Sequence, residues 1–441
     1  MFCWRHLAMV ADGSGLRPPN RWDALLTLRG VACCLVIVAH CGPPAQSLVW
    51  AGQDWSWVLF APGGVAVRVF FCLSGYLIGK GFYTERYRLD RPGIIRYFQS
   101  RATRILPLYY ACILISATVF YPHSWQPNHW GHLLRLLTFT YEHSLPFEFN
   151  APLWSLSTEV QFYAIAPLIF WASRRWLKTG QLLLVAMAAV TGGLMLYRFG
   201  VFELIEQLLG STEGNPYFIR YIYTFLPANL DAFLVGFWLN PLMQKLHQNR
   251  PPTIDLAEGK TNPIEPGQRL SVRPWVALAW GRSILGLPWK GWAIGAMGLL
   301  YGLAAWWKYQ GSDRVLLVAP GLTVLATGLF IFAFERRVYF SSGRNRPLSR
   351  SAMAANPFRA WELLGLLSFG LYVWHYPLLK VIGPLITNRS SLVAYGERLG
   401  LVFLGSIALA SFTYWAIEVP ASRWRNKAQR SPTRSLNDSN R

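Results

Sequence analysis

Residues 315–334 read VLLVAPGLTVLATGLFIFAF, a stretch of 20 residues without a single charge. A helix needs about 20 apolar residues to cross the hydrocarbon core of a bilayer, so this stretch is typical of a membrane span. Similar apolar blocks occur at residues 182–197 and 293–307. Over its 441 residues the chain is 53% hydrophobic and only 14% charged, whereas soluble domains carry about 25% charged residues. The sequence therefore predicts an all-α integral membrane protein.

The same criterion, applied along the whole chain, predicts a bundle of about ten transmembrane helices. The expected ranges are 24–42, 56–79, 104–121, 152–172, 181–197, 220–239, 291–307, 315–334, 362–386 and 399–418. We expect one transmembrane domain over residues 21–420 and a polar, disordered cytoplasmic tail over residues 421–441. Residues 249–270 are also expected to be poorly ordered, because neither polar segment buries enough apolar surface to fold.

The basic residues indicate which side of the membrane each loop faces. The chain has 42 Lys and Arg residues and a formal net charge of +21. With a cytoplasmic N-terminus, 32 of these cations fall in inner segments and seven in outer loops. The seven outer cations are Arg135, Arg198, Arg220, Lys308, Arg314, Arg389 and Arg398. This asymmetry follows the positive-inside rule, predicts that both termini are cytoplasmic, and accounts for the charge without a nucleic-acid partner.

The six cysteines lie mostly in or beside the expected spans and lack the spacing of metal ligands. Cysteines in such places are usually small apolar packing residues. We therefore expect no metal site and no tightly bound cofactor.

Ionisable residues within a span are costly, so each is a functional candidate. Arg29 and His40 lie 11 residues apart in the first expected span, which places them on one helix face with a rise of roughly 16 Å between them. That rise is comparable to the reach of an extended pantetheine arm. Two readings fit the pair. Either both residues serve one site, or Arg29 snorkels to the inner interface while His40 caps the outer end of the span.

Two more arginines and a carboxylate are also candidates. Arg101 and Arg104 are three residues apart and share a helix face at the start of the third span. Their guanidinium groups suit bidentate binding of phosphate, and they equally suit positive-inside anchoring. Glu159 in the fourth span requires a cation or a histidine as partner, either at a site or in a structural ion pair.

The second and ninth expected spans each contain one further candidate. Arg68 either pairs with Glu159 or meets a substrate. His375 precedes Tyr376 and Pro377, and this proline frees a backbone carbonyl in the helix. His375 is thus either structural or substrate-lining.

Five segments together resemble the acyltransferase family 3, multi-pass bacterial O-acyltransferases that modify surface polysaccharides, lipids and antibiotics. They are LRGVA at 28–32 with ten residues between Arg29 and His40, FFCLSGYLI at 70–78, RATRILPLY at 101–109, LWSLSTE at 153–159 and SFGLYVWH at 368–375. They occur in the family's order across residues 21–420. The resemblance implies ten helices with both termini inside and a place in the inner cell membrane.

The resemblance also implies roles for individual residues. His40 matches the catalytic histidine, and Arg29 is its partner on the donor side. Arg101 and Arg104 match the arginines that bind the donor. Glu159 matches the acid of the fourth span and is expected to orient the His40 imidazole or stabilise its charged form.

Five residues are candidates for lining the substrate site. Four of them lie in the matching segments, namely Ser74, Tyr76, Trp154 and His375, and the fifth is the intramembrane Arg68. Only about twenty polar residues follow Pro420, so we expect no fused esterase-like domain of the kind that some relatives carry.

The expected reaction transfers an acyl group, acetyl by the resemblance, from acyl-CoA as co-substrate to a hydroxyl of an acceptor such as a saccharide. A histidine suits this step because its pKa lies near neutrality. The acceptor hydroxyl either attacks the thioester directly or receives the acyl group from an acyl-histidine. The alternative is a secondary transporter of a glycan or acyl donor, although no repeat between the halves supports it. A membrane glycosyltransferase would require an acidic metal-binding pair that no external loop contains.

Overall fold

The computed structural model describes residues 22–141, 150–210, 216–248, 283–284, 287–336, 356–386 and 391–430. Residues 249–270, which we expect to be poorly ordered, lie outside this range, as do residues 431–441 of the expected tail. The tail begins differently from expectation, because helix α17 (Val419–Arg430) continues past Pro420.

The described residues are almost entirely helical. The helices are α2 Ala24–Cys41, α3 Gly63–Tyr83, α4 Arg91–Ile115, α5 Trp130–Leu137, α6 Leu153–Trp176, α7 Gly180–Leu209, α8 Pro216–Phe218, α9 Leu226–Gln248, α11 Trp289–Tyr309, α12 Arg314–Leu317, α13 Ala319–Glu335, α14 Arg359–Leu366, α15 Ser368–Ile382, α16 Leu392–Thr413 and α17. Short 3₁₀ segments occupy Ser56–Leu59, Pro122–Trp125, Pro127–His129 and Gly383–Leu385, and π-helical segments occupy Ser116–Phe120, Ile219–Thr224 and Tyr414–Glu418.

Two small hairpins complete the secondary structure. Strands β1 (Val49–Trp50) and β2 (Gln53–Asp54) are antiparallel, with Val49 opposite Asp54. Strands β3 (Ser283–Ile284) and β4 (Leu287–Pro288) pair in the same sense, with Ser283 opposite Pro288.

All ten expected ranges coincide with helices, which confirms an all-α, multi-pass membrane protein. Six helical segments of the described chain are long and apolar enough to cross a membrane. They are Ala24–Cys41, Ser56–Tyr83, Arg91–Phe120, Gly180–Leu209, Pro216–Gln248 and Leu392–Arg425. The other four expected spans correspond to α6, α11, α12 with α13, and α14 with α15. The count of about ten spans and the orientation of the termini stay predictions.

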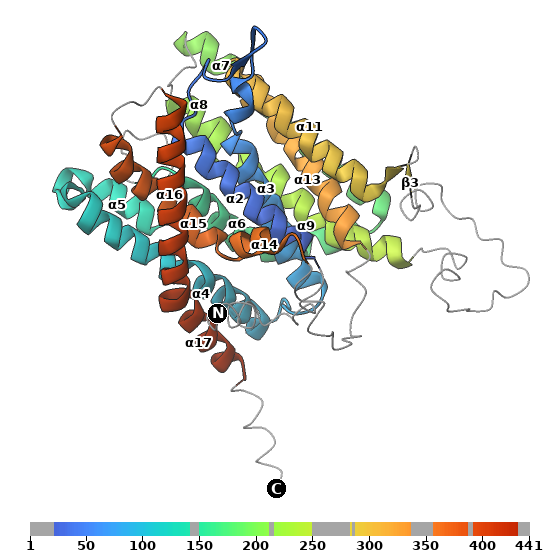
Figure 1. The fold of residues 1–441 in the computed structure, drawn as a ribbon. Helices are drawn as coiled ribbons and strands as arrows, with labels where there is room; N and C mark the ends of the chain where they lie inside the picture. Colours follow the sequence, from blue (N-terminus) through green and yellow to red (C-terminus); the bar gives the residue numbers. More distant parts are fainter. Residues whose placement is uncertain are drawn as a thin grey trace, which may run out of the picture.

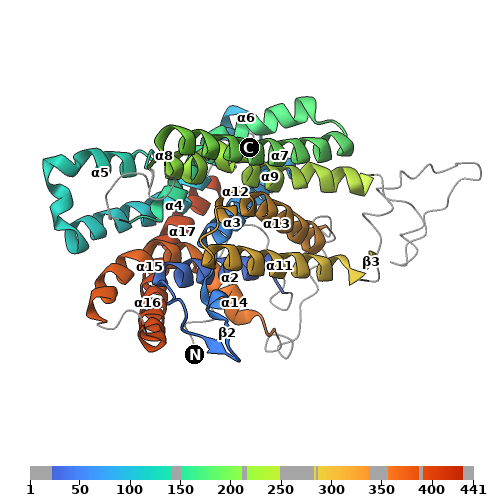
Figure 2. The same cartoon turned by 90° about the horizontal axis from the view of Figure 1, so that it is seen from above.

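Helix α3 occupies the centre of the bundle, where it contacts α2, α6, α9 and α13. Helices α11 and α13 lie side by side along one flank, and α5 projects from the opposite flank (Figures 1 and 2). Helices α15 and α16 pack against each other, and α15 also contacts α2 and α4. This arrangement brings α2, α3, α4, α6 and α15 together around the site described below.

Glycines permit the close approach of α3 and α9. A Cβ at Gly75 would lie 2.1 Å from the carbonyl oxygen of Phe233, and a Cβ at Gly236 would lie 2.0 Å from that of Cys72. Both distances are far below contact, so only glycine fits at either position. Small residues at such crossings are typical of helices that associate in membranes through close packing.

The local sequence around α2 explains its two ends. The Asp23 side chain accepts hydrogen bonds from the backbone N–H groups of Leu25 and Leu26, which satisfies donors of the first turn. Gly42 ends the helix with a left-handed φ of 64°, a conformation that glycine adopts without strain. His40 therefore lies in the last turn of α2.

Two arginines lie elsewhere than expected. The sequence placed Arg198 and Arg398 in outer loops, but the structure places them inside α7 and α16, with exposed fractions of 0% and 6%. Helix α7 extends to Leu209, well beyond the range expected from hydropathy. A span predicted from hydropathy stops at the first charged residue. The helix itself can continue past that residue where its charge has a buried partner. The outer loops therefore contain fewer cations than the sequence suggested.

The topology prediction is tested by single cysteines in two described loops. Arg88→Cys lies in the turn between α3 and α4, which we expect in the cytoplasm, and Gln53→Cys lies in the β1–β2 hairpin, which we expect outside. An impermeant maleimide should label Gln53→Cys in intact cells and label Arg88→Cys only after lysis. The unsubstituted protein is the control for the native cysteines. Labelling of Arg88→Cys in intact cells would contradict the orientation.

Candidate active site

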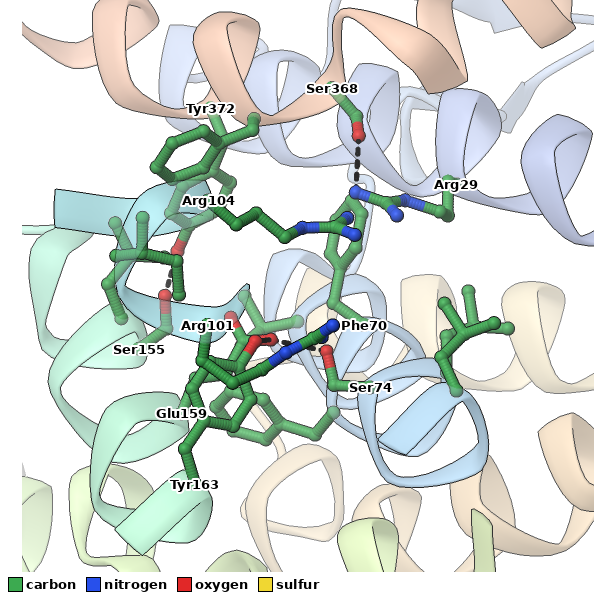
Figure 3. Close-up of a pocket in the computed structure, with 17 residues that line it drawn as sticks. Arg29, Phe70, Ser74, Arg101, Arg104, Ser155, Glu159, Tyr163, Ser368 and Tyr372 are labelled. Carbon is green, nitrogen blue, oxygen red and sulfur yellow. Dashed lines mark hydrogen bonds between the residues drawn. The ribbon is translucent and has the colours of Figure 1, made fainter. Parts of the chain in front are cut away.

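A pocket lies where α2, α3, α4, α6 and α15 meet (Figure 3). The residues that line it include charged, hydroxyl and aromatic side chains from all five helices: Arg29, Phe70, Ser74, Arg101, Arg104, Ser155, Glu159, Tyr163, Ser368 and Tyr372. Four of the predicted site residues, Arg29, Arg101, Arg104 and Glu159, thus meet in one cavity. They come from three helices, and the sequence alone did not require that they meet.

Glu159 is held by two hydroxyl groups. The Ser74 hydroxyl on α3 and the Tyr163 hydroxyl one turn along α6 both donate to Oε1 of Glu159. Glu159 makes no hydrogen bond to His40 or Arg68 in the described structure, so neither expected pairing of Glu159 is present.

The three arginines give the pocket a positive character that one carboxylate offsets only in part. Arg29 Nη2 donates to Ser368 Oγ at 3.1 Å. Arg101 Nη2 lies 3.3 Å from the hydroxyl oxygens of both Tyr87 and Ser100. The Nε atoms of Arg29 and Arg101 are buried without a partner among the described residues. Figure 3 shows Arg29 and Arg104 extending toward the same space.

The positive charge of Arg101 also acts on Tyr87. Tyr87 lies in the turn before α4, and its burial by itself would raise the pKa of the phenol. The charge of Arg101 and the hydrogen bond with Ser100 outweigh burial and bring the pKa of Tyr87 below its usual value. The charge of Arg101 is therefore felt at Tyr87, in the turn between α3 and α4.

His40 lies outside this pocket, next to His375. The His40 Nδ1 atom lies 2.9 Å from the carbonyl oxygen of Val36 and 3.2 Å from His375 Nε2. His375 is fully buried, and its Nδ1 atom lies 2.6 Å from the carbonyl oxygen of Tyr372. Two predicted residues that are 335 positions apart in sequence are thus in direct contact.

These contacts determine the tautomers of the two rings. A carbonyl oxygen can only accept, so Nδ1 of His375 carries its proton and Nε2 of His375 has a lone pair. That lone pair accepts a hydrogen bond from the Nδ1–H group of His40. The carbonyl oxygen of Val36 accepts a second hydrogen bond from the same group. The lone pair of a neutral His40 therefore lies on Nε2, the nitrogen that can take a proton from a substrate.

The pocket and the His40–His375 pair are linked along α15. Tyr372 lines the pocket, and its backbone carbonyl oxygen accepts the hydrogen bond from His375 Nδ1 one turn further on. The rings of Phe70 and Tyr372 meet edge to face at 6.2 Å at this end of the pocket. A chain that extends from the arginines toward His40 therefore has to pass this aromatic pair.

The remaining predicted substrate-lining residues are distributed unevenly. Ser74 lines the pocket. Tyr76 is buried and donates to Glu335, which also pairs with Lys80 at 3.1 Å. Trp154 packs its ring against Phe71 at 6.0 Å. Tyr76 and Trp154 are thus not among the residues that line the pocket.

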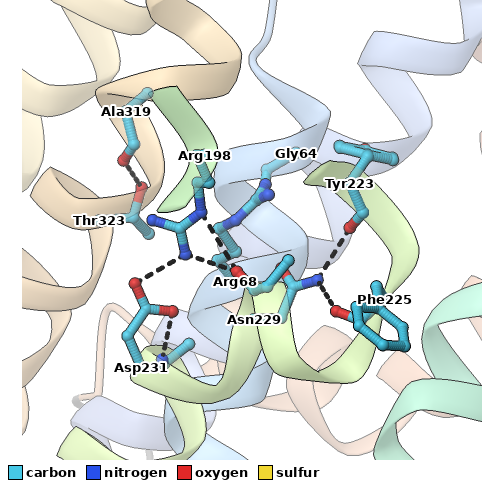
Figure 4. A network of polar contacts seen from close by, with 11 residues as sticks. Gly64, Arg68, Arg198, Tyr223, Phe225, Asn229, Asp231, Ala319 and Thr323 are labelled. Carbon is cyan, nitrogen blue, oxygen red and sulfur yellow. Dashed lines mark hydrogen bonds and ion pairs between the residues drawn. The ribbon is translucent and has the colours of Figure 1, made fainter. Parts of the chain in front are cut away.

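Arg68 is placed in a separate buried cluster with Arg198 and Asp231 (Figure 4). Arg68 does not pair with Glu159 and does not line this pocket, and its role toward a substrate stays a prediction.

Several site residues were missed at the level of sequence. Tyr163 is four residues after Glu159, so helical spacing alone could have identified it. Ser155, Ser368 and Tyr372 fall within the segments that carry the resemblance. Arg398 had no such signal. Its side chain donates from Nε to the carbonyl oxygen of Cys41 at 2.7 Å and from Nη2 to that of Gly42 at 2.9 Å, and so caps α2 directly after His40.

No group of three or more His, Cys, Asp or Glu residues with the geometry of a metal site occurs in the described part of the chain. The polar groups of the pocket are guanidinium, carboxylate and hydroxyl groups, which suit an anionic organic ligand.

Comparison with known proteins relates this arrangement to a family. A family model described as an acyltransferase domain matches residues 22–416. The chain is 23% identical over 389 residues to O-acetyltransferase OatA of Staphylococcus aureus, covering 83% of this chain and 54% of that protein. It is 29% identical over 165 residues to acyltransferase MdmB of Streptomyces mycarofaciens, covering 34% and 40%.

A third relative is nodulation protein 10 of Rhizobium leguminosarum bv. viciae, 28% identical over 226 residues, covering 45% of this chain and 57% of that protein. The chain thus spans about half the length of the curated relatives it matches. No solved structure shows a significant match.

Proposed function

Because this chain belongs to the acyltransferase family 3, we propose that it transfers an acyl group from acyl-CoA to a hydroxyl group of an acceptor. The observation that carries the proposal is the joint placement of an electropositive pocket and a paired histidine along the same helix, α15. Acetyl is the preferred group, because one relative is named an O-acetyltransferase.

The proposed donor site is the pocket. CoA is anionic, and guanidinium groups bind phosphate through paired, charge-assisted hydrogen bonds. Arg101 and Arg104 lie on the side that the predicted topology assigns to the cytoplasm, where acyl-CoA is made. Arg29 lines the same pocket and is a third cation for the donor. The pantetheine arm then extends past Phe70 and Tyr372 toward His40.

The proposed base is His40. Its Nε2 lone pair takes the proton of the acceptor hydroxyl, and the hydroxyl oxygen attacks the thioester carbonyl carbon. The C–S bond then breaks, and the CoA thiolate leaves and takes up a proton. His375 is a positioning residue in this scheme, because its hydrogen bond fixes the tautomer of His40 as the third group of a triad does. Transfer through an acyl-histidine would use the same nitrogen.

In this proposal Glu159 has a different role from the expected one. Its carboxylate balances the arginines and holds Ser74 and Tyr163, so it shapes the donor pocket instead of orienting His40. In the proposal the acceptor is a surface glycan, lipid or similar molecule that approaches from the opposite face. The protein spans the inner cell membrane with about ten helices and both termini inside.

The proposal is tested with the purified full-length protein in lipid nanodiscs. Wild type should release CoA from acetyl-CoA when an acceptor fraction from cell-surface glycans is present, and mass spectrometry should find the acetyl group on that fraction. If CoA release does not depend on any acceptor fraction, and no acetylated product forms, the proposed activity is wrong.

The donor arginines give a more specific prediction. Arg101→Ala and Arg104→Ala should each raise the KM for acetyl-CoA by about tenfold, because each removes a charge-assisted contact to phosphate. Lysine at either position should restore binding only in part, since a point charge replaces a planar fork.

Steady-state kinetics with varied acetyl-CoA measures this effect. Arg314→Ala, in an exposed position of α12, is the matched control and should keep the wild-type KM. Wild-type KM values for both pocket variants would mean that Arg101 and Arg104 only anchor the helix.

A further inference from the structure

A second cationic cluster is buried between α3, α7 and α9. Arg68, Arg198 and Asp231 have exposed fractions of 2%, 0% and 0%. Arg198 pairs with Asp231 at 2.7 Å and also donates to the carbonyl oxygen of Ala228 at 2.6 Å (Figure 4). This ion pair is internally balanced and fully shielded from solvent.

Arg68 adds a charge that no described carboxylate neutralises. Its Nη1 donates to the carbonyl oxygen of Gly64 at 3.2 Å, and its guanidinium lies 5.4 Å from the centre of the Tyr223 ring. Its Nε and Nη2 atoms, together with Nη1 of Arg198, are buried without a hydrogen-bond partner in the described part of the chain. A buried cation with unsatisfied donors is costly, most of all inside a membrane protein.

The position of the cluster relates it to the proposed base. Arg68 is bonded to Gly64, and a Cβ at the adjacent Gly63 would lie 3.0 Å from the Cβ of Ala39. Ala39 directly precedes His40 in α2. The Arg68 guanidinium is therefore bonded to the first turn of α3, the turn that packs against α2 next to His40.

We infer that Arg68 and Arg198 bind an oxyanion, a carboxylate or phosphate group, that belongs to the acceptor. This inference rests on the proposed function. An anion at this place would satisfy the unpartnered N–H groups and neutralise the excess charge. Guanidinium groups are the side chains best suited to bind either oxyanion. The bound anion would orient the acceptor so that a neighbouring hydroxyl reaches His40.

The test measures anion binding without catalysis. The Tm of the purified full-length protein is followed in zwitterionic buffer while sodium phosphate or sodium acetate is added, with sodium chloride at the same ionic strength as reference. Wild type should show a saturable rise of about 2 °C at high anion, because a ligand that binds only the folded state stabilises it.

Two variants make the test specific. Arg68→Gln removes the excess charge and leaves the Arg198–Asp231 pair intact, so without anion its Tm should equal or exceed that of wild type. Its anion response should be smaller than that of wild type, with only the part that comes from the donor pocket remaining. Arg314→Gln, at an exposed position of α12, is the matched control and should respond like wild type. Absence of a response in wild type, an equal response in Arg68→Gln, or a large drop in Tm of Arg68→Gln without anion would each overturn the site.

A further comparison assigns the source of the anion. Glucuronate should raise the Tm of wild type more than acetate does, and glucose should have no effect, if the anion is part of a saccharide acceptor. A response to glucuronate no larger than that to acetate would overturn the acceptor assignment. Because no step requires acyl transfer, the result is independent of whether the proposed activity is found.

Discussion

His40→Ala should lower acyl transfer by about two to four orders of magnitude, the usual range for loss of a general base. The variant should insert and fold, because His40 is exposed in the last turn of α2 and the cap made by Arg398 uses only backbone atoms of that helix. CoA release and acceptor acetylation are measured on purified protein that elutes as wild type does. KM for acetyl-CoA should change little, because His40 does not line the donor pocket.

The neighbouring histidine provides a graded control. His375→Ala removes one of the two acceptors of the His40 Nδ1 proton and should lower turnover by a smaller factor. His375→Gln places an amide oxygen near the former Nε2 and should restore part of the rate, since that oxygen also accepts a hydrogen bond. A merely structural His375 would instead give equal losses for both variants. Turnover of His40→Ala close to that of wild type would remove His40 from the mechanism.

The pocket was largely predictable because its arginines follow helical spacing. Arg101 and Arg104 share a face by their separation of three, and they do line one cavity. Placement of Arg29 and Glu159 in the same cavity depends on how α2 and α6 pack around α3, and that packing depends on glycines such as Gly75 and Gly236 whose partners lie far away in sequence. Helical periodicity identifies which residues share a face of a helix. Tertiary contacts determine which other residues pack against that face.

The contact of His40 with His375 could not be read from spacing. Each residue had its own local interpretation, and only the packing of α15 against α2 brings them together. The expected orienting partner of His40, Glu159, instead meets Ser74 and Tyr163. A hydrogen-bonding partner for His40 was expected from its proposed chemistry. That chemistry alone did not identify His375 as the partner.

Arg198 shows why charge counts along the sequence fail inside a bundle. Hydropathy treats each arginine as a loop residue, because an isolated guanidinium is costly in the membrane. Asp231 lies 33 residues further on, in α9, and pairs with Arg198 out of contact with solvent. A sequence reading that weighs residues singly cannot detect such a pair, and so it overstated the number of outer cations.

Glu159→Gln should lower kcat/KM for acetyl-CoA by about 10²- to 10³-fold. The amide is nearly isosteric but neutral, so the bonds from Ser74 and Tyr163 lose their charge assistance, which is worth about 1.5–3 kcal/mol for each bond. Each 1.4 kcal/mol corresponds to roughly a tenfold change in rate. The three arginines of the pocket would also lose their only carboxylate among the lining residues, and they would repel one another and shift.

Glu335→Gln is the matched control for this prediction. Glu335 is also buried and bonded to a tyrosine and a lysine, Tyr76 and Lys80, yet it does not line the pocket. This variant should lower the Tm while the KM for acetyl-CoA stays near that of wild type, because the bonds it weakens join α3 to α13 and not to the donor site. Glu159→Gln should combine a modest change in Tm with the large kinetic loss. If both variants lost stability and activity in parallel, Glu159 would hold the helices together without shaping the donor pocket. The proposed donor pocket would then have no acidic residue with a role in it.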